Sequence, residues 1–218
     1  MATSDDPQEL GRRWAREDQP VNELIAALSA EQLPVALAAY ATELKALYAA
    51  EAQRDALTQL GNRAAFEHHL AAESARALRY GRVLTVALLD LDGFKQVNDT
   101  HGHAAGDSAL QQFAALLKAS LRQSDQAFRY GGDEFAVLFP ETSATAVEGV
   151  MLRLKERMAA VNCAYGFSWG CAAVPDDLPE PDDLPEPGDL PEADANEPRA
   201  LLLAADARLY AQKRERRL

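Results

Sequence analysis

Residues 128–139 read FRYGGDEFAVLF, with an apolar run on each side of Gly131 and Gly132. Aromatic and β-branched residues favour strands, and two glycines tolerate the positive φ angles of a tight turn. The stretch therefore predicts a β-hairpin. Asp133 and Glu134 open its second strand, so two carboxylates stand directly beside the turn.

The apolar run over 83–89 predicts a strand that can pair with this hairpin. It reads VLTVALL and is apolar on both faces, as expected for a central strand that is covered on both sides. The strand stops at Asp90, so it also ends in a carboxylate.

Helical and strand patterns alternate through the rest of the second half. Helices are expected over 62–81, over 107–121 with Asp107 as its cap, over 142–158 and over 201–210, and a further strand over 164–174. One central sheet of mixed strand direction, with helices packed on it, satisfies this element order. The sequence thus predicts an α+β domain.

Residues 1–54 are interpreted as an α-helical N-terminal extension that is rich in Ala and Leu. One apolar stripe at helical spacing consists of Leu37, Ala41, Leu44 and Tyr48. A stripe this short fits either a packing helix or a dimer stalk, and self-association is the favoured interpretation. The predicted domains are therefore this extension, serving input or dimerisation, and residues 55–218.

An acidic, proline-rich insertion interrupts the second domain at 175–198. It holds seven of the eleven prolines and ten acidic residues, without a Lys or Arg. Proline is excluded from helix interiors and central strands, and like charges repel, so a solvated, extended or disordered loop is expected. An acidic lure for a basic partner is the alternative interpretation.

The net charge of −12 comes mainly from this insertion. Without its ten acids the chain has 22 basic and 24 acidic residues, or −2, so no DNA-binding face is implied. No apolar run reaches the roughly 18 residues that span a bilayer, and the first ten residues, MATSDDPQEL, are acidic without an apolar core. A cytoplasmic protein without a membrane span is expected.

Four acidic residues indicate a metal site. Asp90 and Asp92 end the central strand, and Asp133 and Glu134 follow the turn of the hairpin. If the hairpin pairs beside that strand, carboxylates from both meet at one sheet edge and can hold a hard cation, Mg²⁺ being expected and Mn²⁺ the alternative. Two other interpretations stay open: Asp92 caps the helix that begins at Phe94, or Asp133 and Glu134 are solvated turn acids.

Polar residues near these acids fit a guanine nucleotide. Gly131 and Gly132 let the backbone approach a ligand, and Lys95 can neutralise phosphate oxygens beside a metal. Asn98 and Asp107 offer paired groups for a base edge, and a carboxylate accepts from the N1–H and exocyclic amine of guanine. GTP is therefore expected rather than ATP.

Four motifs carry a resemblance to a known family. They are DALTQLGNR at 55–63, DLDGFKQVND at 90–99, HGH at 101–103 with Gly106 and Asp107, and RYGGDEF at 129–135. Together they resemble the GGDEF-domain diguanylate cyclases. The resemblance implies a nucleotidyl cyclase-like fold and the condensation of two GTP molecules into cyclic di-GMP with release of two pyrophosphates.

The resemblance also implies roles for individual residues. Metal would be held by Asp90, Asp133 and the Leu91 carbonyl, while Glu134 would assist there and help to deprotonate the 3′-hydroxyl. Guanine would be bound by Asn98 and Asp107. The phosphates would be bound by Lys95 and the amides of Gly93 and Phe94, with the backbone of Gly131 and Gly132 close to the nucleotide.

The run from Arg122 to Asp125 reads RQSD and resembles the family's RxxD product-inhibition site, with Arg153 as a further arginine on the next helix. Arginine suits a bidentate grip on phosphate and guanine. Cyclic di-GMP is thus expected to be an inhibitor as well as the product. A weak surface pair between Arg122 and Asp125 at a helix end is the alternative.

The last helix departs from the family pattern, in which K-x-x-G-R-N follows it. Lys213 and Arg217 stand four apart and could reach phosphates, but Arg216 replaces the glycine. Basic residues that complement the dipole of their own helix are the alternative interpretation.

Each domain would hold one GTP, so the resemblance implies a homodimer with two domains face to face. The N-terminal extension would then raise the effective concentration of one half-site near the other. The alternative function is a catalytically silent module that binds GTP or cyclic di-GMP and acts through dimerisation. The intact GGDEF run at 131–135 favours the enzyme, since a receptor does not need both acids.

Overall fold

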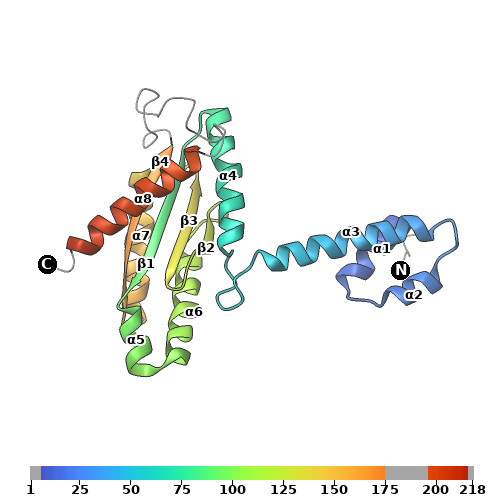
Figure 1. The fold of residues 1–218 in the computed structure, drawn as a ribbon, viewed down its shortest axis with the longest axis horizontal. Helices are drawn as coiled ribbons and strands as arrows, with labels where there is room; N and C mark the ends of the chain where they lie inside the picture. The colour runs from blue at the N-terminus through green and yellow to red at the C-terminus, as the bar shows by residue number, and fades with distance from the viewer. Residues whose placement is uncertain (1–5, 175–195, 216–218) are drawn as a thin grey trace. The chain divides into compact units, whose positions relative to one another are not determined.

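The structure is a computed structural model that describes residues 6–174 and 196–215 (Figure 1). The chain divides into two compact units, Met1–Arg54 and Asp55–Leu218, and each is described by itself. The predicted acidic insertion lies outside the described residues except for its last three positions. None of the described helices is both long and apolar enough to cross a membrane.

Residues 6–54 of the first unit contain three helices, α1 (Pro7–Arg16), α2 (Val21–Ala27) and α3 (Leu33–Ala52). Asp6 caps α1 by accepting a hydrogen bond from the Gln8 amide, and Pro20 directly precedes α2. Helix α1 packs closely on α3, because a Cβ on Gly11 would lie 2.2 Å from the Ala36 carbonyl oxygen. The predicted helical extension is confirmed, while its role in self-association stays a prediction.

Among the described residues of the second unit, four strands form a sheet: β1 (Leu84–Asp92), β2 (Gln126–Arg129), β3 (Glu134–Pro140) and β4 (Gly166–Val174). Their order is β2-β3-β1-β4, and all three neighbouring pairs run antiparallel. The predicted mixed strand direction is therefore wrong for these pairs. β1 and β2 run in the same direction, and so do β3 and β4. The members of each parallel pair are not neighbours, because the crossover between them passes over one strand, which is antiparallel to both.

In the described part of the second unit, five helices accompany this sheet: α4 (Arg63–Tyr80), α5 (Phe94–His101), α6 (His103–Ser120), α7 (Ala144–Ala160) and α8 (Asn196–Glu215). Helices α6 and α7 contribute to the core on one face, and α4 and α8 contribute to the core on the other (Figure 1). The predicted α+β class, with helices packed on one central sheet, is confirmed.

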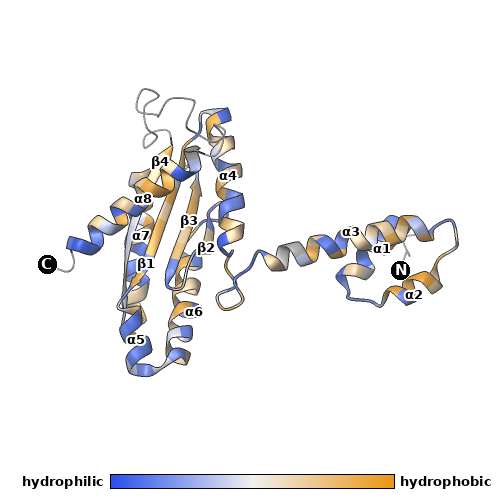
Figure 2. Ribbon diagram, in the orientation of Figure 1, coloured by the Kyte–Doolittle hydropathy of each residue, from blue (hydrophilic) through white to orange (hydrophobic). Residues whose placement is uncertain are grey.

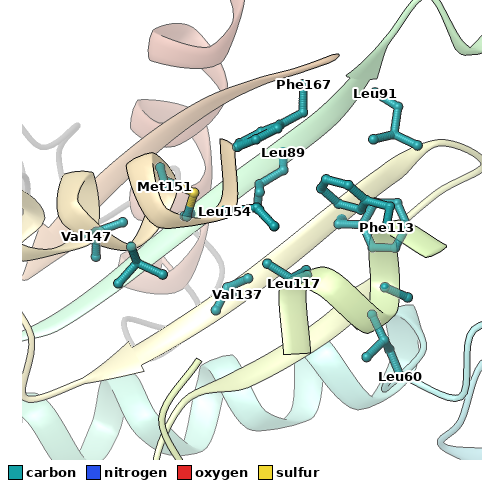
Figure 3. Close-up of a cluster of buried hydrophobic side chains, with 14 of the residues drawn as sticks. Leu60, Leu89, Leu91, Phe113, Leu117, Val137, Val147, Met151, Leu154 and Phe167 are labelled. Atoms are coloured by element: carbon teal, nitrogen blue, oxygen red, sulfur yellow. The ribbon is translucent and has the colours of Figure 1, made fainter. Parts of the chain in front are cut away.

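Strand β1 serves both cores because successive residues of a strand face opposite sides. Leu89 belongs to the core with α6 and α7, and Leu88 belongs to the core with α4 and α8. Figure 3 shows the first core, in which Phe113 from α6 and Leu154 from α7 approach the sheet. In Figure 2 the strands are coloured hydrophobic along most of their length. A run that is apolar on both faces therefore corresponds to a strand that is covered on both faces.

Three helix starts in this unit depend on a single residue each. Asn62 and Ser143 cap α4 and α7 by accepting hydrogen bonds from backbone amides. The predicted cap at Asp107 is wrong, because α6 begins earlier, directly after Gly102. Gly102 has a φ of 81°, which ends α5 and allows the chain to start α6 at once. Asp107 consequently lies inside α6.

The hairpin turn is longer than predicted. Residues 130–133 separate β2 from β3, and neither Gly131 nor Gly132 has a positive φ. The amides of Tyr130 and Gly131 both donate to the Glu134 carbonyl, at 2.8 and 3.1 Å. These two hydrogen bonds close the turn without a left-handed residue, so the expected positive φ angles are wrong.

Candidate active site

The hairpin turn lies beside the end of β1. Asp90 pairs with Glu134 in the antiparallel register, and the Leu91 amide donates to the Asp133 carbonyl at 3.2 Å. Residues that oppose each other in an antiparallel pair project toward the same face of the sheet. Acidic residues from two distant segments are thus brought together at one end of the sheet.

A cavity of about 850 Å³ opens at this end of the sheet. Its wall contains the end of β1, the start of α5, the hairpin turn and one residue of α8. Eight of the predicted site residues line it: Asp90, Leu91, Asp92, Gly93, Phe94, Lys95, Asp133 and Lys213. The volume is in the range of cavities that hold nucleotide-sized ligands.

Asp90 is a largely buried acid of this cavity that pairs with a lysine. Its carboxylate lies 2.6 Å from the Lys213 ammonium, and its side chain is only 14% exposed. Burial raises the pKa of Asp90, Lys213 acts against this, and the charges of Asp133 and Asp92 raise the pKa further, so that it lies above its ordinary value. The negative charge at this point is therefore incompletely compensated, which favours an added cation.

Asp92 does not cap α5, because the N-cap position is Gly93 and no side chain caps it. The Asp92 carboxylate instead accepts a hydrogen bond from the Ser168 hydroxyl at 2.7 Å. Ser168 is fully buried and stands opposite Asp90 on β4. The interpretation of Asp92 as a helix cap is therefore wrong, and this acid is tied to β4 at the cavity wall.

Gly93 turns the chain from β1 into α5. Its φ of 77° lies in the left-handed region that other residues rarely adopt. The turn places the first residues of α5, including Lys95, at the cavity. The unpaired amides at a helix start and a Lys ammonium both favour a phosphate group.

The donor set fits a magnesium ion that is shared with a substrate. Asp90 and Asp133 can supply two carboxylates and Leu91 a carbonyl oxygen. Across residues 6–174 and 196–215, no group of three or more His, Cys, Asp or Glu side chains is arranged to hold a metal by itself. Magnesium is typically bound by one or two carboxylates together with substrate phosphates and water, which agrees with so small a donor set.

Three predicted residues of the hairpin do not line the cavity: Gly131, Gly132 and Glu134. The Glu134 side chain is exposed, and a Cβ on Gly131 would lie 2.3 Å from its Oε2. The Glu134 carboxylate therefore lies over Gly131. Glu134 was expected to assist at the metal site, but it does not line the cavity that contains Asp90, Leu91 and Asp133.

Sequence reasoning missed the pair of residues that supports the turn. Arg129 donates to the Gly132 carbonyl through Nε and Nη2, at 3.1 and 2.8 Å, and to the Asp55 carboxylate at 3.3 Å. Asp55 also accepts from the amide and hydroxyl of Thr58, at 2.8 and 2.7 Å. These hydrogen bonds hold Gly132, the residue directly before Asp133, and thereby fix the position of Asp133. The available signal was the Asp55–Thr58 spacing, which is typical of an acid that caps a turn.

Asn98 lies on α5 and Asp107 on α6, near the junction of the two helices. A Cβ on Gly106 would lie 1.9 Å from Asn98 Oδ1, so the Asn98 side chain rests on the glycine that precedes Asp107. Asp107 is exposed, and neither it nor Asn98 lines the cavity of about 850 Å³. The predicted guanine-binding residues thus lie near the α5–α6 junction, and neither of them lines this cavity.

The predicted inhibitory run forms a tight turn after α6. The Asp125 carboxylate accepts from the Arg122 amide at 2.9 Å, and the Asp125 amide donates to the Arg122 carbonyl at 3.1 Å. Asp125 therefore binds the backbone of Arg122, whose side chain is exposed. Arg153 is exposed on α7, and Arg217 lies outside the described residues.

Comparison with known families matches residues 52–185 to the model described as "Diguanylate cyclase, GGDEF domain". The matched segment is more than half of the chain. The chain belongs to the GGDEF family. The cavity, the end of β1 and the hairpin turn all lie mainly within the matched segment of this GGDEF domain.

Two curated relatives of this GGDEF domain come from Pseudomonas aeruginosa. Diguanylate cyclase DgcP is 45% identical over 117 residues, which are 54% of this chain and 17% of that protein. Diguanylate cyclase TpbB is 38% identical over 168 residues, which are 77% of this chain and 36% of that protein. The chain therefore spans well under half of the length of both relatives.

A solved structure with the same fold is the GGDEF domain of DgcB from Caulobacter crescentus, in complex with c-di-GMP. It is 30% identical to this chain with a TM-score of 0.62, and the match covers 75% of this chain and 91% of that one. The similarity therefore includes nearly all of the solved GGDEF domain.

Asp55→Asn is expected to destabilise this GGDEF domain in a pH-dependent way. Burial acts to raise the pKa of Asp55, but the Thr58 hydrogen bonds and Arg129 outweigh it, so the pKa is lowered. A lowered pKa stabilises the folded state above the unfolded-state value of about 3.9, and this contribution is lost as the pH falls through the folded-state value.

Urea unfolding near neutral pH should give a loss of about 1 to 3 kcal/mol in the free energy of unfolding. The difference between the variant and the wild type should shrink as the pH falls below about 4. A difference that stays constant over this range would contradict a stabilising role of the Asp55 charge.

Proposed function

We propose that the protein is an active diguanylate cyclase that condenses two GTP molecules into cyclic di-GMP and releases two pyrophosphates. The observation that carries this proposal is a nucleotide-sized cavity that gathers Asp90 and Asp133 with Lys95 and Lys213. Nucleotidyl transfer needs carboxylates for a metal and cations for the phosphates in the same place. Membership of the GGDEF family supports GTP as the nucleotide.

Asp90, Asp133 and the Leu91 carbonyl would hold Mg²⁺, with Mn²⁺ as the alternative. When bound, the metal ion supplies neutralisation of the phosphate charge that builds up during transfer. Lys95 and the first amides of α5 would bind phosphate oxygens, and Lys213 would pair with phosphate when Asp90 serves the metal. The Asp55–Arg129 pair would keep Asp133 in position through Gly132.

Asn98 and Asp107 would bind guanine at the α5–α6 junction. Glu134, exposed beside the cavity, would accept the proton of a 3′-hydroxyl group presented by a second GTP. Because each domain binds one GTP, two domains must meet face to face, so the active species would be a homodimer. The helical N-terminal unit would support this homodimer by self-association.

Arg122→Ala should separate turnover from inhibition by cyclic di-GMP. The Arg122 side chain is exposed outside the cavity, and Asp125 binds the backbone amide and carbonyl of Arg122, both of which alanine retains. We expect an unchanged initial rate, while the slowing of late progress curves by accumulated product should disappear. Gln123→Ala on the same turn is the matched control and should behave like the wild type. Progress curves of Arg122→Ala that superimpose on those of the wild type would contradict the inhibitory site.

A catalytically silent module that binds GTP or cyclic di-GMP and acts through dimerisation is the second candidate. The observation in its favour is the position of Glu134, whose carboxylate lies over Gly131 and does not line the cavity. A receptor could bind a nucleotide in the cavity through Asp90 and Lys95 without Glu134 reaching the metal.

The two candidates differ in their products. Purified protein, stripped of bound nucleotide, should convert GTP with Mg²⁺ into cyclic di-GMP and pyrophosphate, measured by mass spectrometry and by a coupled pyrophosphate assay. ATP is the matched control and should give no cyclic dinucleotide. Absence of product from GTP at high protein concentration, with GTP binding retained, would overturn the enzyme and support the silent module.

A further inference from the structure

Strand β4 lies at the edge of the sheet, because the order is β2-β3-β1-β4. One side of β4 pairs with β1, and the backbone groups on its other side need different partners. Helix α8 lies against this strand (Figure 1) and its side chains supply two of those partners.

Two residues of α8 bind the backbone of β4. The Trp169 amide donates to Gln212 Oε1 at 2.7 Å, and Arg208 Nη1 donates to the Cys171 carbonyl at 2.6 Å. The two helix residues are four apart, a rise of about 6 Å, and the two strand residues are two apart, a rise of about 6.6 Å. The two spacings are similar, so both hydrogen bonds can form together at one axial position of α8. Gln212 and Arg208 are called the α8 clip below.

Gly170 lies between the two strand residues that the clip binds. A Cβ at this position would lie 2.2 Å from the Leu209 amide nitrogen and 2.3 Å from the Ala205 carbonyl oxygen. The backbone of α8 therefore rests directly on β4, without a side chain between them. This close contact sets the distance between the helix and the strand, while the clip sets the axial position.

Lys213 directly follows Gln212 and is the α8 residue that lines the cavity. Its ammonium reaches Asp90 on β1 at 2.6 Å. A lysine side chain is long and flexible, so its reach into the cavity depends on where its Cα is held. The neighbouring hydrogen bond of Gln212 holds the Cα of Lys213 close to the sheet.

We propose that Gln212 and Arg208 are positioning residues that hold Lys213 at the phosphate-binding side of the cavity. This inference rests on the proposed function, in which Lys213 binds phosphate oxygens of GTP. Gln212 and Arg208 do not line the cavity, and in this proposal they act only by positioning Lys213.

The first test is a double-mutant cycle on Gln212 and Lys213. Binding of α,β-methylene-GTP in the presence of Mg²⁺ is measured by calorimetry, so that no turnover is needed. Gln212→Met should weaken binding by about three- to tenfold, the range for loss of one hydrogen bond. In the Lys213→Met background the same change should have no further effect. Arg208→Met should behave like Gln212→Met, and Arg214→Met, an exposed position on the same helix, is the control.

The outcomes separate the clip from the proposed function. A wild type that does not bind the analogue would contradict the proposed function. Lys213→Met binding like the wild type would contradict the phosphate role of Lys213 and the clip with it. Additive losses for Gln212→Met and Lys213→Met would contradict the clip alone, because the two residues would then act independently.

A second measurement needs no nucleotide. The rate at which an amine-reactive reagent modifies Lys213 is followed by mass spectrometry, with exposed Lys118 as the internal reference. Gln212→Met should increase the rate several-fold, because Lys213 is then no longer held at Asp90. Equal rates in the folded variant and the wild type, with both melting curves cooperative, would overturn the clip whatever the protein binds.

Discussion

Asp133→Asn is expected to lower the rate of cyclic di-GMP formation by about a hundredfold to a thousandfold and to leave the fold intact. The Asp133 side chain lines the cavity, where it adds to the negative charge around Asp90. The amide keeps the shape of the side chain but removes the charge that would bind Mg²⁺. The Asp133 carbonyl still accepts from the Leu91 amide, so the hairpin turn should keep its place beside β1.

Two measurements check this expectation, the initial rate with GTP and the affinity for Mn²⁺ by electron paramagnetic resonance. Both should fall in Asp133→Asn, while the melting temperature should change little. Asp206→Asn is the matched control, because it makes the same chemical change at an exposed position of α8. An unchanged rate and Mn²⁺ affinity in Asp133→Asn would remove this residue from the metal site.

Gly170→Ala is expected to destabilise the second unit by about 3 kcal/mol. The added methyl group would meet backbone atoms of α8, the Leu209 nitrogen at 2.2 Å and the Ala205 carbonyl oxygen at 2.3 Å. Backbone atoms of a packed helix cannot rotate away as a side chain can, so α8 must shift from β4. The shift should also withdraw Lys213 from Asp90 and weaken binding of the GTP analogue.

Gly149→Ala is the matched control, because only Arg153 Nη1 lies within 4 Å of the added Cβ, at 3.8 Å. Alanine is the better helix former, so this variant should be more stable by about 0.5 to 1 kcal/mol. The free energies of unfolding are compared in urea. If Gly170→Ala were as stable as the wild type, the direct contact between α8 and β4 would be wrong.

The meeting of Asp90 and Asp133 was predictable from the sequence. One apolar run ends at Asp90, and the second strand of the hairpin opens with Asp133 and Glu134. If these two segments pair, the acids meet at one sheet edge, and β1 and β3 do pair in this way. The periodicity of apolar residues also revealed most helices, because burial on one face leaves a regular spacing.

Features that depend on tertiary contacts were not predictable. The strand order β2-β3-β1-β4 places antiparallel neighbours between parallel strands, and no local pattern encodes which strand enters the centre. The start of α6 at His103 depends on the φ of Gly102, which outweighed the capping preference of Asp107. The contacts of Arg129 with Asp55 and of Lys213 with Asp90 each join segments far apart in the chain.

The central claim is that Asp90 and Asp133 hold one metal ion beside the nucleotide phosphates. A crystal structure of the protein with α,β-methylene-GTP and Mn²⁺, recorded at the manganese absorption edge, tests it most directly. The predicted result is an anomalous peak about 2.1 to 2.3 Å from carboxylate oxygens of both residues, with phosphate oxygens in the same coordination shell and Lys213 turned from Asp90 to the phosphates. Nucleotide bound without a metal at these two acids, or metal bound elsewhere, would contradict the claim.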